Sequence, residues 1–235
     1  YSKDADQLGL SVEAYQAALR QWTLKAAPYD YAAAQNNLGN ALTDRAKYSK
    51  SDADYQAGID AYATALTVWS KDRQPLQWAA VQNNIGAAYA TIGRAEKGTG
   101  SFAKAVEAYE LCLTARTKDN DPRNWALTEY NLGLVLVDLA DRSKAPGIWQ
   151  QATDAFTASL EVYTQDESPS DWADVQEYLG WSLAHLGALK QDRGMIKDGR
   201  AAMQTAYEYY KDQNGAAAYY QDKLAAIDKL MKSVK

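Results

Sequence analysis

The amino-acid sequence predicts an all-α fold, a right-handed α-solenoid in which about ten helices form antiparallel pairs along a superhelix. One observation behind this prediction is a motif that occurs four times, as QNNLG, QNNIG, EYNLG and QEYLG, and whose closing glycines recur every 47 residues. The other is that apolar residues follow the helical period, and no segment alternates as a strand would. Repetition at such a period is typical of solenoids, in which each unit buries its apolar faces against its neighbours.

The first predicted element is a helix over residues 8–25. It carries Ala14 followed by the large Tyr15, with Leu19 four residues further on. The same pattern returns every 47 residues in the second helix of each later unit, and we call these second helices B helices. The leading B helix has no first helix before it. It either covers this end of the array or follows repeats that have been removed, and a chain that begins at Tyr1 indicates truncation or processing.

Four predicted units follow, over residues 28–70, 75–117, 122–164 and 169–211, and each begins at a proline. Proline suits the first turn of a helix, where its missing amide hydrogen would have no partner, and it stops the helix before it. The first helix of each unit, the A helix, has an apolar face, which in the second unit consists of Trp78, Val81, Ile85, Ala88 and Ile92. Its B helix carries Phe102, Val106, Tyr109 and Leu113 at helical spacing.

The repeated glycine lies in the middle of each A helix, where it costs about 1 kcal/mol relative to alanine. Its return at one position in Gly39, Gly86, Gly133 and Gly180 indicates that only a hydrogen fits there. We therefore expect the A helix to approach the B helix closely at this turn. The small residues that recur along the B helices would provide the matching shallow surface.

The last predicted element is a helix over residues 215–234 that covers the final pair. It departs from the repeat, because Ala226 and Ile227 occupy the positions of the leucine and glycine. Its apolar residues and intervening lysines suit a helix with one buried and one solvated face.

Composition narrows the classes of partner. The 235 residues are 47% hydrophobic and 23% charged, with a net charge of −5, as in ordinary soluble domains. This charge disfavours nucleic acid and anionic membranes as partners. No apolar run is long enough to insert into a membrane, and no signal sequence is recognisable. The localisation stays open, with a lean towards the cytoplasm.

These features together resemble the tetratricopeptide repeat (TPR). The resemblance rests on the Leu-Gly pair in the A helix, the small and aromatic residues of the B helix and the proline at the joint. It covers nearly the whole chain, as a single solenoid over residues 1–235. The unit of 47 residues exceeds the standard repeat of about 34, and resembles the long bacterial variant with a W-A-x-x-Q-N-N-L-G signature, here WAAVQNNIG and WALTEYNLG. We expect longer helices and a longer A-to-B connector to accommodate the difference.

The resemblance implies a concave groove, lined by one edge of every A helix, that holds a peptide or helix of a partner. Carried over position by position, the groove residues are Asn36, Asn40 and Asp44; Asn83, Ala87 and Thr91; Tyr130, Leu134 and Asp138; and Glu177, Trp181 and His185. None of these residues is a lysine or arginine, which disfavours the clamp for a terminal carboxylate known in this family.

Two alternatives stay open for the groove residues. The asparagine amides of Asn36 and Asn83 either bind a ligand's backbone or hydrogen-bond to neighbouring helices and hold the stacking angle, and Asn37 and Asn84 fit the second role better. Trp181 either forms part of an exposed aromatic hot spot or packs beneath the final helix.

The sequence offers little for catalysis. His185 is the only histidine and Cys112 the only cysteine, so no ordinary zinc site and no triad containing histidine can be assembled. We expect a scaffold for protein or peptide partners that is not an enzyme and needs no metal or cofactor. The alternatives are a structural module that self-associates through its N-terminal end and a regulatory repeat domain excised from a larger protein.

Overall fold

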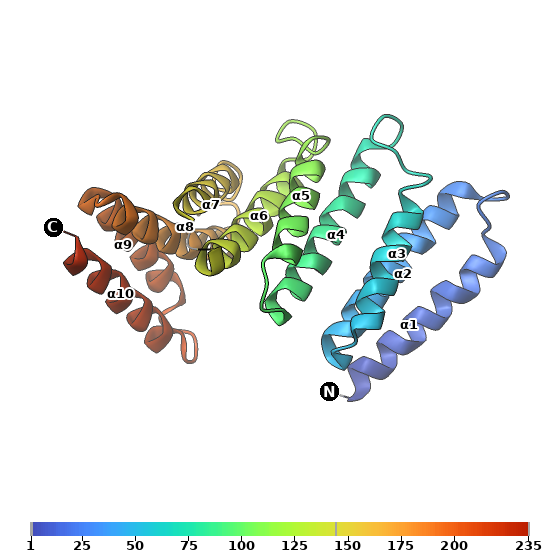
Figure 1. Cartoon of the computed structure of the whole chain (residues 1–235), viewed down its shortest axis with the longest axis horizontal. Coiled ribbons are helices and arrows are strands. Elements are labelled where there is room, and N and C mark those ends of the chain that lie inside the picture. Colours follow the sequence, from blue (N-terminus) through green and yellow to red (C-terminus); the bar gives the residue numbers. More distant parts are fainter. Residues whose placement is uncertain (1, 144, 235) are drawn as a thin grey trace. The chain divides into compact units, whose positions relative to one another are not determined.

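The computed structural model describes residues 2–143 and 145–234, and the side chains of residues 7–143, 145 and 147–234. Within these residues the chain folds into ten α-helices and contains no strand (Figure 1). The helices are α1 (Ser2–Gln21), α2 (Pro28–Ser49), α3 (Asp52–Ala65), α4 (Pro75–Ala95), α5 (Gly100–Leu113), α6 (Pro122–Ser143), α7 (Pro146–Ser159), α8 (Pro169–Lys190), α9 (Arg193–Tyr210) and α10 (Ala216–Ser233). None of the described helices has the length and apolar character needed to cross a membrane.

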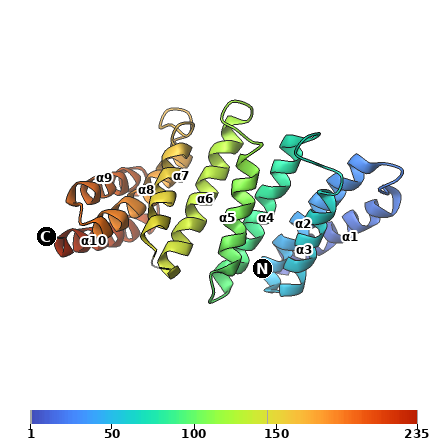
Figure 2. The same ribbon diagram turned by 45° about the horizontal axis from the view of Figure 1, so that its top comes forward.

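The helices form two compact units, Tyr1–Arg116 with α1 to α5 and Thr117–Lys235 with α6 to α10. Within each unit, consecutive helices pack against each other and run in opposite directions, as Figures 1 and 2 show. The A helices are α2, α4, α6 and α8, and the B helices are α1, α3, α5, α7 and α9. The predicted all-α class with paired helices is thus confirmed in each unit, whereas the right-handed superhelix stays a prediction.

The joint that leads into each A helix has the same structure every time. Proline is the first residue of α2, α4, α6 and α8. Just before it, a backbone amide donates to the carbonyl oxygen four residues earlier, in the pairs Ala27–Thr23, Gln74–Ser70, Asp121–Thr117 and Ser168–Thr164, with N to O distances of 2.9–3.0 Å. The repeat therefore includes its connecting segment as well as its two helices.

Two expectations about segment lengths are wrong. The leading helix runs over Ser2–Gln21 rather than over residues 8–25. The A-to-B connectors after α2 and α8 are not long, because Lys50 and Gln191 adopt left-handed conformations, with φ of 52° and 58°, directly after these helices. This conformation ends a helix abruptly, so α3 begins at Asp52. The extra length of the unit lies in A helices of 22 residues and in the B-to-A joints.

The repeated glycine does mark a close approach of the A and B helices, and in the first three pairs the atoms nearest to it belong to an aromatic ring of the B helix. A Cβ atom on Gly39 would lie 2.5 Å from the ring of Tyr62 in α3, and one on Gly133 would lie 2.5 Å from the ring of Phe156 in α7. The glycine thus makes room for the aromatic residue that follows the recurring alanine of the B helix. No side chain fits at the glycine because the aromatic ring already occupies that space.

The last glycine of the series meets backbone instead of a ring. A Cβ atom on Gly180 of α8 would lie 2.6 Å from the carbonyl oxygen of Gly199 and 2.7 Å from the amide nitrogen of Met203, both in α9. At this contact two glycines, Gly180 and Gly199, face each other, and the two backbones touch because neither helix carries a side chain there.

The final helix, α10, packs against both α8 and α9. Tyr220, Leu224 and Ile227 are buried in a cluster with residues of α8 and α9. Arg200 of α9 donates two hydrogen bonds to the carboxylate of Asp228, at 2.7 and 3.3 Å. The helix is therefore held by an apolar face and by an ion pair at its edge.

Candidate partner-binding surface

In the first unit, the predicted groove positions of two A helices meet at one cavity. It measures about 260 Å³ and lies between α2 and α4, with Tyr62 of α3 at its base. It is lined by Asn40, Thr43, Asp44, Lys47, Tyr62, Asn84, Ala87, Ala88 and Thr91. Four of these residues, Asn40, Asp44, Ala87 and Thr91, are positions named from the sequence, and the structure brings them together.

The walls of this cavity are polar and partly ordered by their own hydrogen bonds. The hydroxyl of Tyr62 donates to Oδ1 of Asn40 at 2.7 Å and lies 3.3 Å from Oγ1 of Thr43. Burial raises the pKa of Tyr62 to about 12, so the phenol stays protonated and remains a donor at neutral pH. At the rim, Lys47 Nζ lies 2.6 Å from a carboxylate oxygen of Asp44. The cavity is therefore lined by amide and hydroxyl groups, and the ion pair of Lys47 and Asp44 at its rim carries no net charge.

The repeated asparagines connect neighbouring A helices. Nδ2 of Asn84 on α4 donates to Oδ1 of Asn36 on α2 at 3.0 Å, and Nδ2 of Asn36 donates to Oδ1 of Asn37 at 3.3 Å. These bonds favour the stacking role for Asn36, which the sequence left open. Asn83, the other amide named as a ligand contact, is half-buried on α4.

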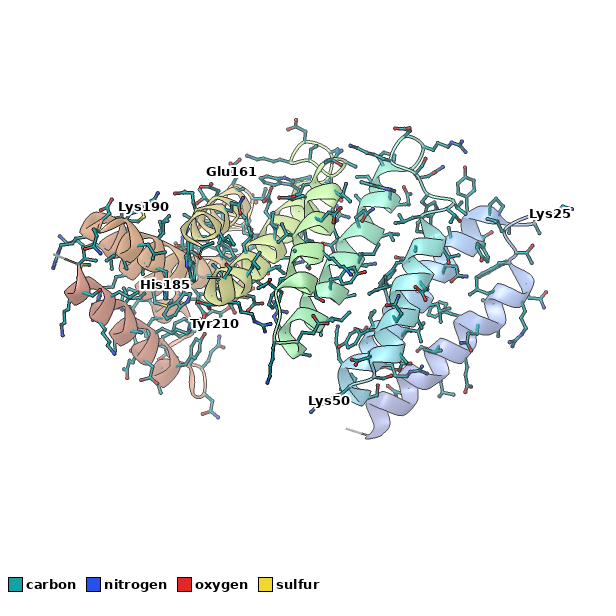
Figure 3. The ribbon with its side chains drawn as sticks, viewed as in Figure 1. Lys25, Lys50, Glu161, His185, Lys190 and Tyr210 are labelled. Atoms are coloured by element: carbon teal, nitrogen blue, oxygen red, sulfur yellow. The ribbon has the colours of Figure 1, made fainter. Side chains whose placement is uncertain are left out.

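In the second unit, the groove residue His185 lines a cavity of about 350 Å³. The other lining residues are Ala140, Asp141, Trp149, Ala188, Leu189 and Leu230. The imidazole stacks on the indole of Trp149, with ring centroids 4.6 Å apart and planes 9° apart. Figure 3 labels His185 among the side chains. Burial lowers the pKa of His185, although the nearby Asp141 carboxylate raises it in part. The ring is therefore held in its neutral form, within an apolar cavity that has one carboxylate at its edge.

Trp181 lies beneath the final helix rather than forming an open aromatic surface. Its ring packs against the apolar cluster that includes α10. Lys223 of α10 places its Nζ 4.2 Å from the ring centroid, a cation–π geometry. Of the two roles left open for this residue, the structure favours packing.

Glu177 is also covered by α10, and its side chain is not available at an open surface. The residue is only 7% exposed. Its carboxylate accepts hydrogen bonds from the hydroxyls of Tyr219 and Tyr220, the latter at 2.7 Å. A buried carboxylate needs such donors to offset the loss of water. The expected groove position is thus an anchor for the C-terminal helix.

The two groove residues of α6 differ in their surroundings. The ring of Tyr130 lies 6.0 Å from that of Phe156 and 5.9 Å from that of Tyr178, measured between centroids. Burial raises the pKa of Tyr130 well above its usual value, so its phenol stays neutral. Leu134, one turn further along, is half-buried. Tyr130 therefore belongs to an aromatic cluster within the second unit.

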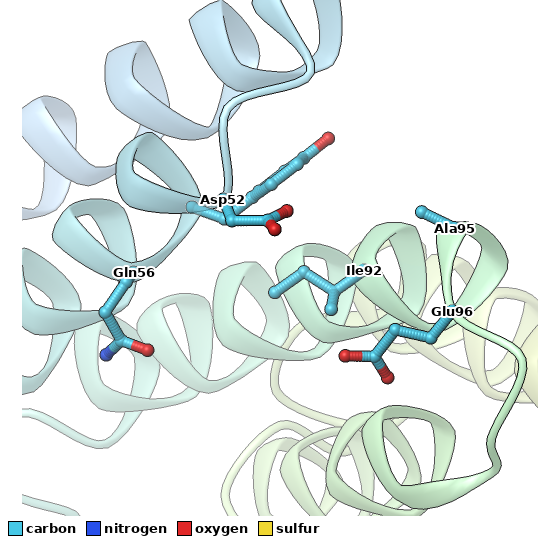
Figure 4. A pocket seen from close by; sticks show the side chains of 6 residues that line it. Asp52, Gln56, Ile92, Ala95 and Glu96 are labelled. Atoms are coloured by element: carbon cyan, nitrogen blue, oxygen red, sulfur yellow. The ribbon is translucent and has the colours of Figure 1, made fainter.

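A second cavity of the first unit was not predicted. It measures about 350 Å³ and lies between the start of α3 and the end of α4. Figure 4 shows the side chains of Asp52 and Gln56 on one side and those of Ile92 and Glu96 on the other. Ser101 donates to Glu96 at 2.7 Å, which orients this carboxylate. No motif marks these residues in the sequence, since they meet only where the B helix α3 of one repeat packs against the A helix α4 of the next repeat.

The described side chains include one cysteine and one histidine, Cys112 and His185. No group of three or more His, Cys, Asp or Glu residues among them could hold a metal ion. Cys112 of α5 is fully buried, and its sulfur lies 3.7 Å from a guanidinium nitrogen of Arg116. The chemistry available at the cavities is hydrogen bonding, apolar contact and a few charges, which suits binding.

No protein-family model matches the chain, and no curated protein matches it.

Proposed function

We propose that this protein is an interaction scaffold of the tetratricopeptide type, which binds a peptide or helical segment of a partner along the edges of its A helices. The observation that carries the proposal is the cavity between α2 and α4. Residues that the resemblance to the tetratricopeptide repeat names as groove positions, Asn40 and Asp44 on α2 and Ala87 and Thr91 on α4, line one hollow there.

The chemistry of this cavity suits a peptide more than a small metabolite. Asn40 presents a side-chain amide NH2 that can donate to a peptide carbonyl. The hydroxyls of Thr43, Tyr62 and Thr91 donate within the chain, so towards a peptide they act as acceptors for N–H groups. Its volume of about 260 Å³ lies just below the range typical of small-molecule pockets, about 300 to 1,000 Å³. A hollow of this size accommodates one side chain of a longer bound segment.

The second unit supports a different kind of contact. Whereas α10 covers Glu177 and Trp181, the predicted groove position His185 lines a cavity. It is mostly apolar, and Leu189 at its edge is 49% exposed. We expect this cavity to take an apolar side chain of the partner.

The test is a peptide-display selection on the full chain, followed by calorimetry with the selected peptides. Ala87→Arg would fill the cavity between α2 and α4 from an exposed position, and we expect it to weaken binding at least tenfold. Ala57→Arg, at an exposed position of α3 away from the cavity, is the matched control. Peptides that bind both variants equally well would show that the cavity is not the binding site.

A further inference from the structure

The hydrogen bonds inside the cavity between α2 and α4 leave it rich in acceptors. Three hydroxyls line it, and each gives its hydrogen to a group of the same chain. Tyr62 donates to Oδ1 of Asn40 at 2.7 Å, Thr43 to the carbonyl oxygen of Asn40 at 3.0 Å, and Thr91 to the carbonyl oxygen of Ala87 at 2.9 Å. A hydroxyl that has given its hydrogen away can only accept from a ligand. These three oxygens are therefore acceptors towards a bound group.

Two side-chain amides of the same cavity are oriented by their own hydrogen bonds. Because Oδ1 of Asn40 accepts from Tyr62, the NH2 group of this amide, with two donors, is left for a ligand. Nδ2 of Asn84 donates to Asn36 on the neighbouring helix at 3.0 Å, which leaves Oδ1 of Asn84 as a further acceptor. The cavity thus presents one amide NH2 group and several oxygen acceptors.

The charged groups of the cavity compensate each other. Its lining includes one carboxylate and one ammonium group, those of Asp44 and Lys47, which lie 2.6 Å apart at the rim. A charged side chain of a partner would gain little from this pair and would lose its water on entering. A purely apolar side chain would leave the NH2 group of Asn40 without water and without an acceptor. The cavity therefore favours a neutral polar side chain.

Among neutral polar side chains, a primary carboxamide matches this arrangement best. Its NH2 group carries two donors for the oxygen acceptors of the cavity, and its carbonyl oxygen accepts from Asn40. The volume of about 260 Å³ accommodates such a side chain, and Ala87 and Ala88 give its methylene groups an apolar wall. We propose that the partner segment inserts a glutamine or asparagine side chain into the cavity between α2 and α4. This inference rests on the function proposed above and specifies the residue that the cavity selects.

The test uses the peptides that display selection recovers on the full protein. Peptides whose binding is weakened by Ala87→Arg are those that occupy this cavity, and we expect them to share a glutamine or asparagine at one position. In calorimetry, replacing that residue with leucine or with the corresponding acid should weaken binding at least tenfold. The reason is that the NH2 group of Asn40 or the oxygen acceptors would then be left unpaired in the complex.

A single substitution in the protein should change the selected residue. Asn40→Asp keeps an acceptor for Tyr62 but replaces the NH2 donors with a second carboxylate oxygen. We expect this variant to bind the glutamine peptide at least tenfold more weakly, and to bind the lysine version of that peptide more tightly than the unmodified protein does. Gln16→Glu, at an exposed position of α1, makes the same change in charge and should alter neither affinity. A loss of folding would not exchange one preference for the other.

The results separate this inference from the function on which it rests. If no selected peptide loses affinity with Ala87→Arg, the function proposed for the cavity is wrong, and so is the assignment of its occupant. If the peptides depend on the cavity but share no carboxamide, or bind equally well after the change to leucine, the proposed function stands and the assignment is overturned. An Asn40→Asp variant that still prefers the glutamine peptide to the lysine peptide would overturn the assignment too.

Discussion

Glu129 provides a sharp test of the electrostatics of the repeat. It stands on α6 in the column of Gln35, Gln82 and Gln176, where the other units carry a neutral amide. The carboxyl is half-buried, and this burial, together with the negative charge of Glu161, raises its pKa from 4.5 to about 7. The folded protein therefore holds this proton more tightly than the unfolded chain does.

The magnitude follows from the shift. At about 1.4 kcal/mol per pKa unit, a change from 4.5 to about 7 corresponds to about 3 kcal/mol for a fully buried group. Because the side chain is partly exposed, solvent screening reduces this to about 1 to 2 kcal/mol. The raised pKa lowers the free energy of unfolding above pH 7, where the folded state must hold the ionised carboxylate of Glu129. The penalty fades as the pH falls from 7 to 4.5 and is absent below that.

The variant Glu129→Gln removes the charge and keeps the shape. We expect it to raise the free energy of unfolding by about 1 to 2 kcal/mol at pH 8 and to have little effect at pH 4.5, as measured by urea denaturation at both pH values. Glu107→Gln, at an exposed position of α5, is the control for a simple change in net charge. A gain of the same size at both pH values, or no gain at pH 8, would refute the reasoning.

Two further predictions concern packing and anchoring. Gly180→Ala should lower the free energy of unfolding by about 1 to 3 kcal/mol, because its Cβ would meet backbone atoms that cannot move aside, whereas Gly9→Ala, with nothing within 4 Å, should stabilise by up to about 1 kcal/mol. Thermal unfolding of the two variants checks this, and a gain for both would show that the contact is not tight. Tyr220→Phe should cost about 1 to 3 kcal/mol, since the buried Glu177 carboxylate loses a donor. Tyr209→Phe, at a residue 39% exposed, is the control in urea denaturation, and equal effects would contradict the anchoring role.

The helices and their pairing could be predicted because they are encoded locally and repeatedly. Proline marks the start of each A helix, and the glycine spacing identifies where two helices touch. The resemblance to the tetratricopeptide repeat placed Asp44 and Thr91 on one surface, and the two line one cavity because residues at equal positions of adjacent A helices become neighbours when the helices stack. A constant period therefore converts positions in the sequence into positions in space.

The predictions became less accurate where the repeat changes. The sequence showed that α10 lacks the usual Leu-Gly pair but did not show that Tyr220 would reach the carboxylate of Glu177. That contact joins residues 43 apart, and no period relates them. Likewise, the bond from Asn84 to Asn36 depends on how far one A helix is rotated against the next, which the spacing alone does not specify.

The hydrogen-bonded joint ahead of each proline has a consequence for how such a chain can change its length. Since Ala27 and Gln74 make the same bond to the carbonyl four residues before them, excision of residues 28–74 would bring Ala27 directly before Pro75 and leave an intact joint. Duplication between the same two points would do the same. A single recombination event can therefore add or remove one whole repeat, because the joint between the remaining repeats keeps its hydrogen bond and needs no new turn.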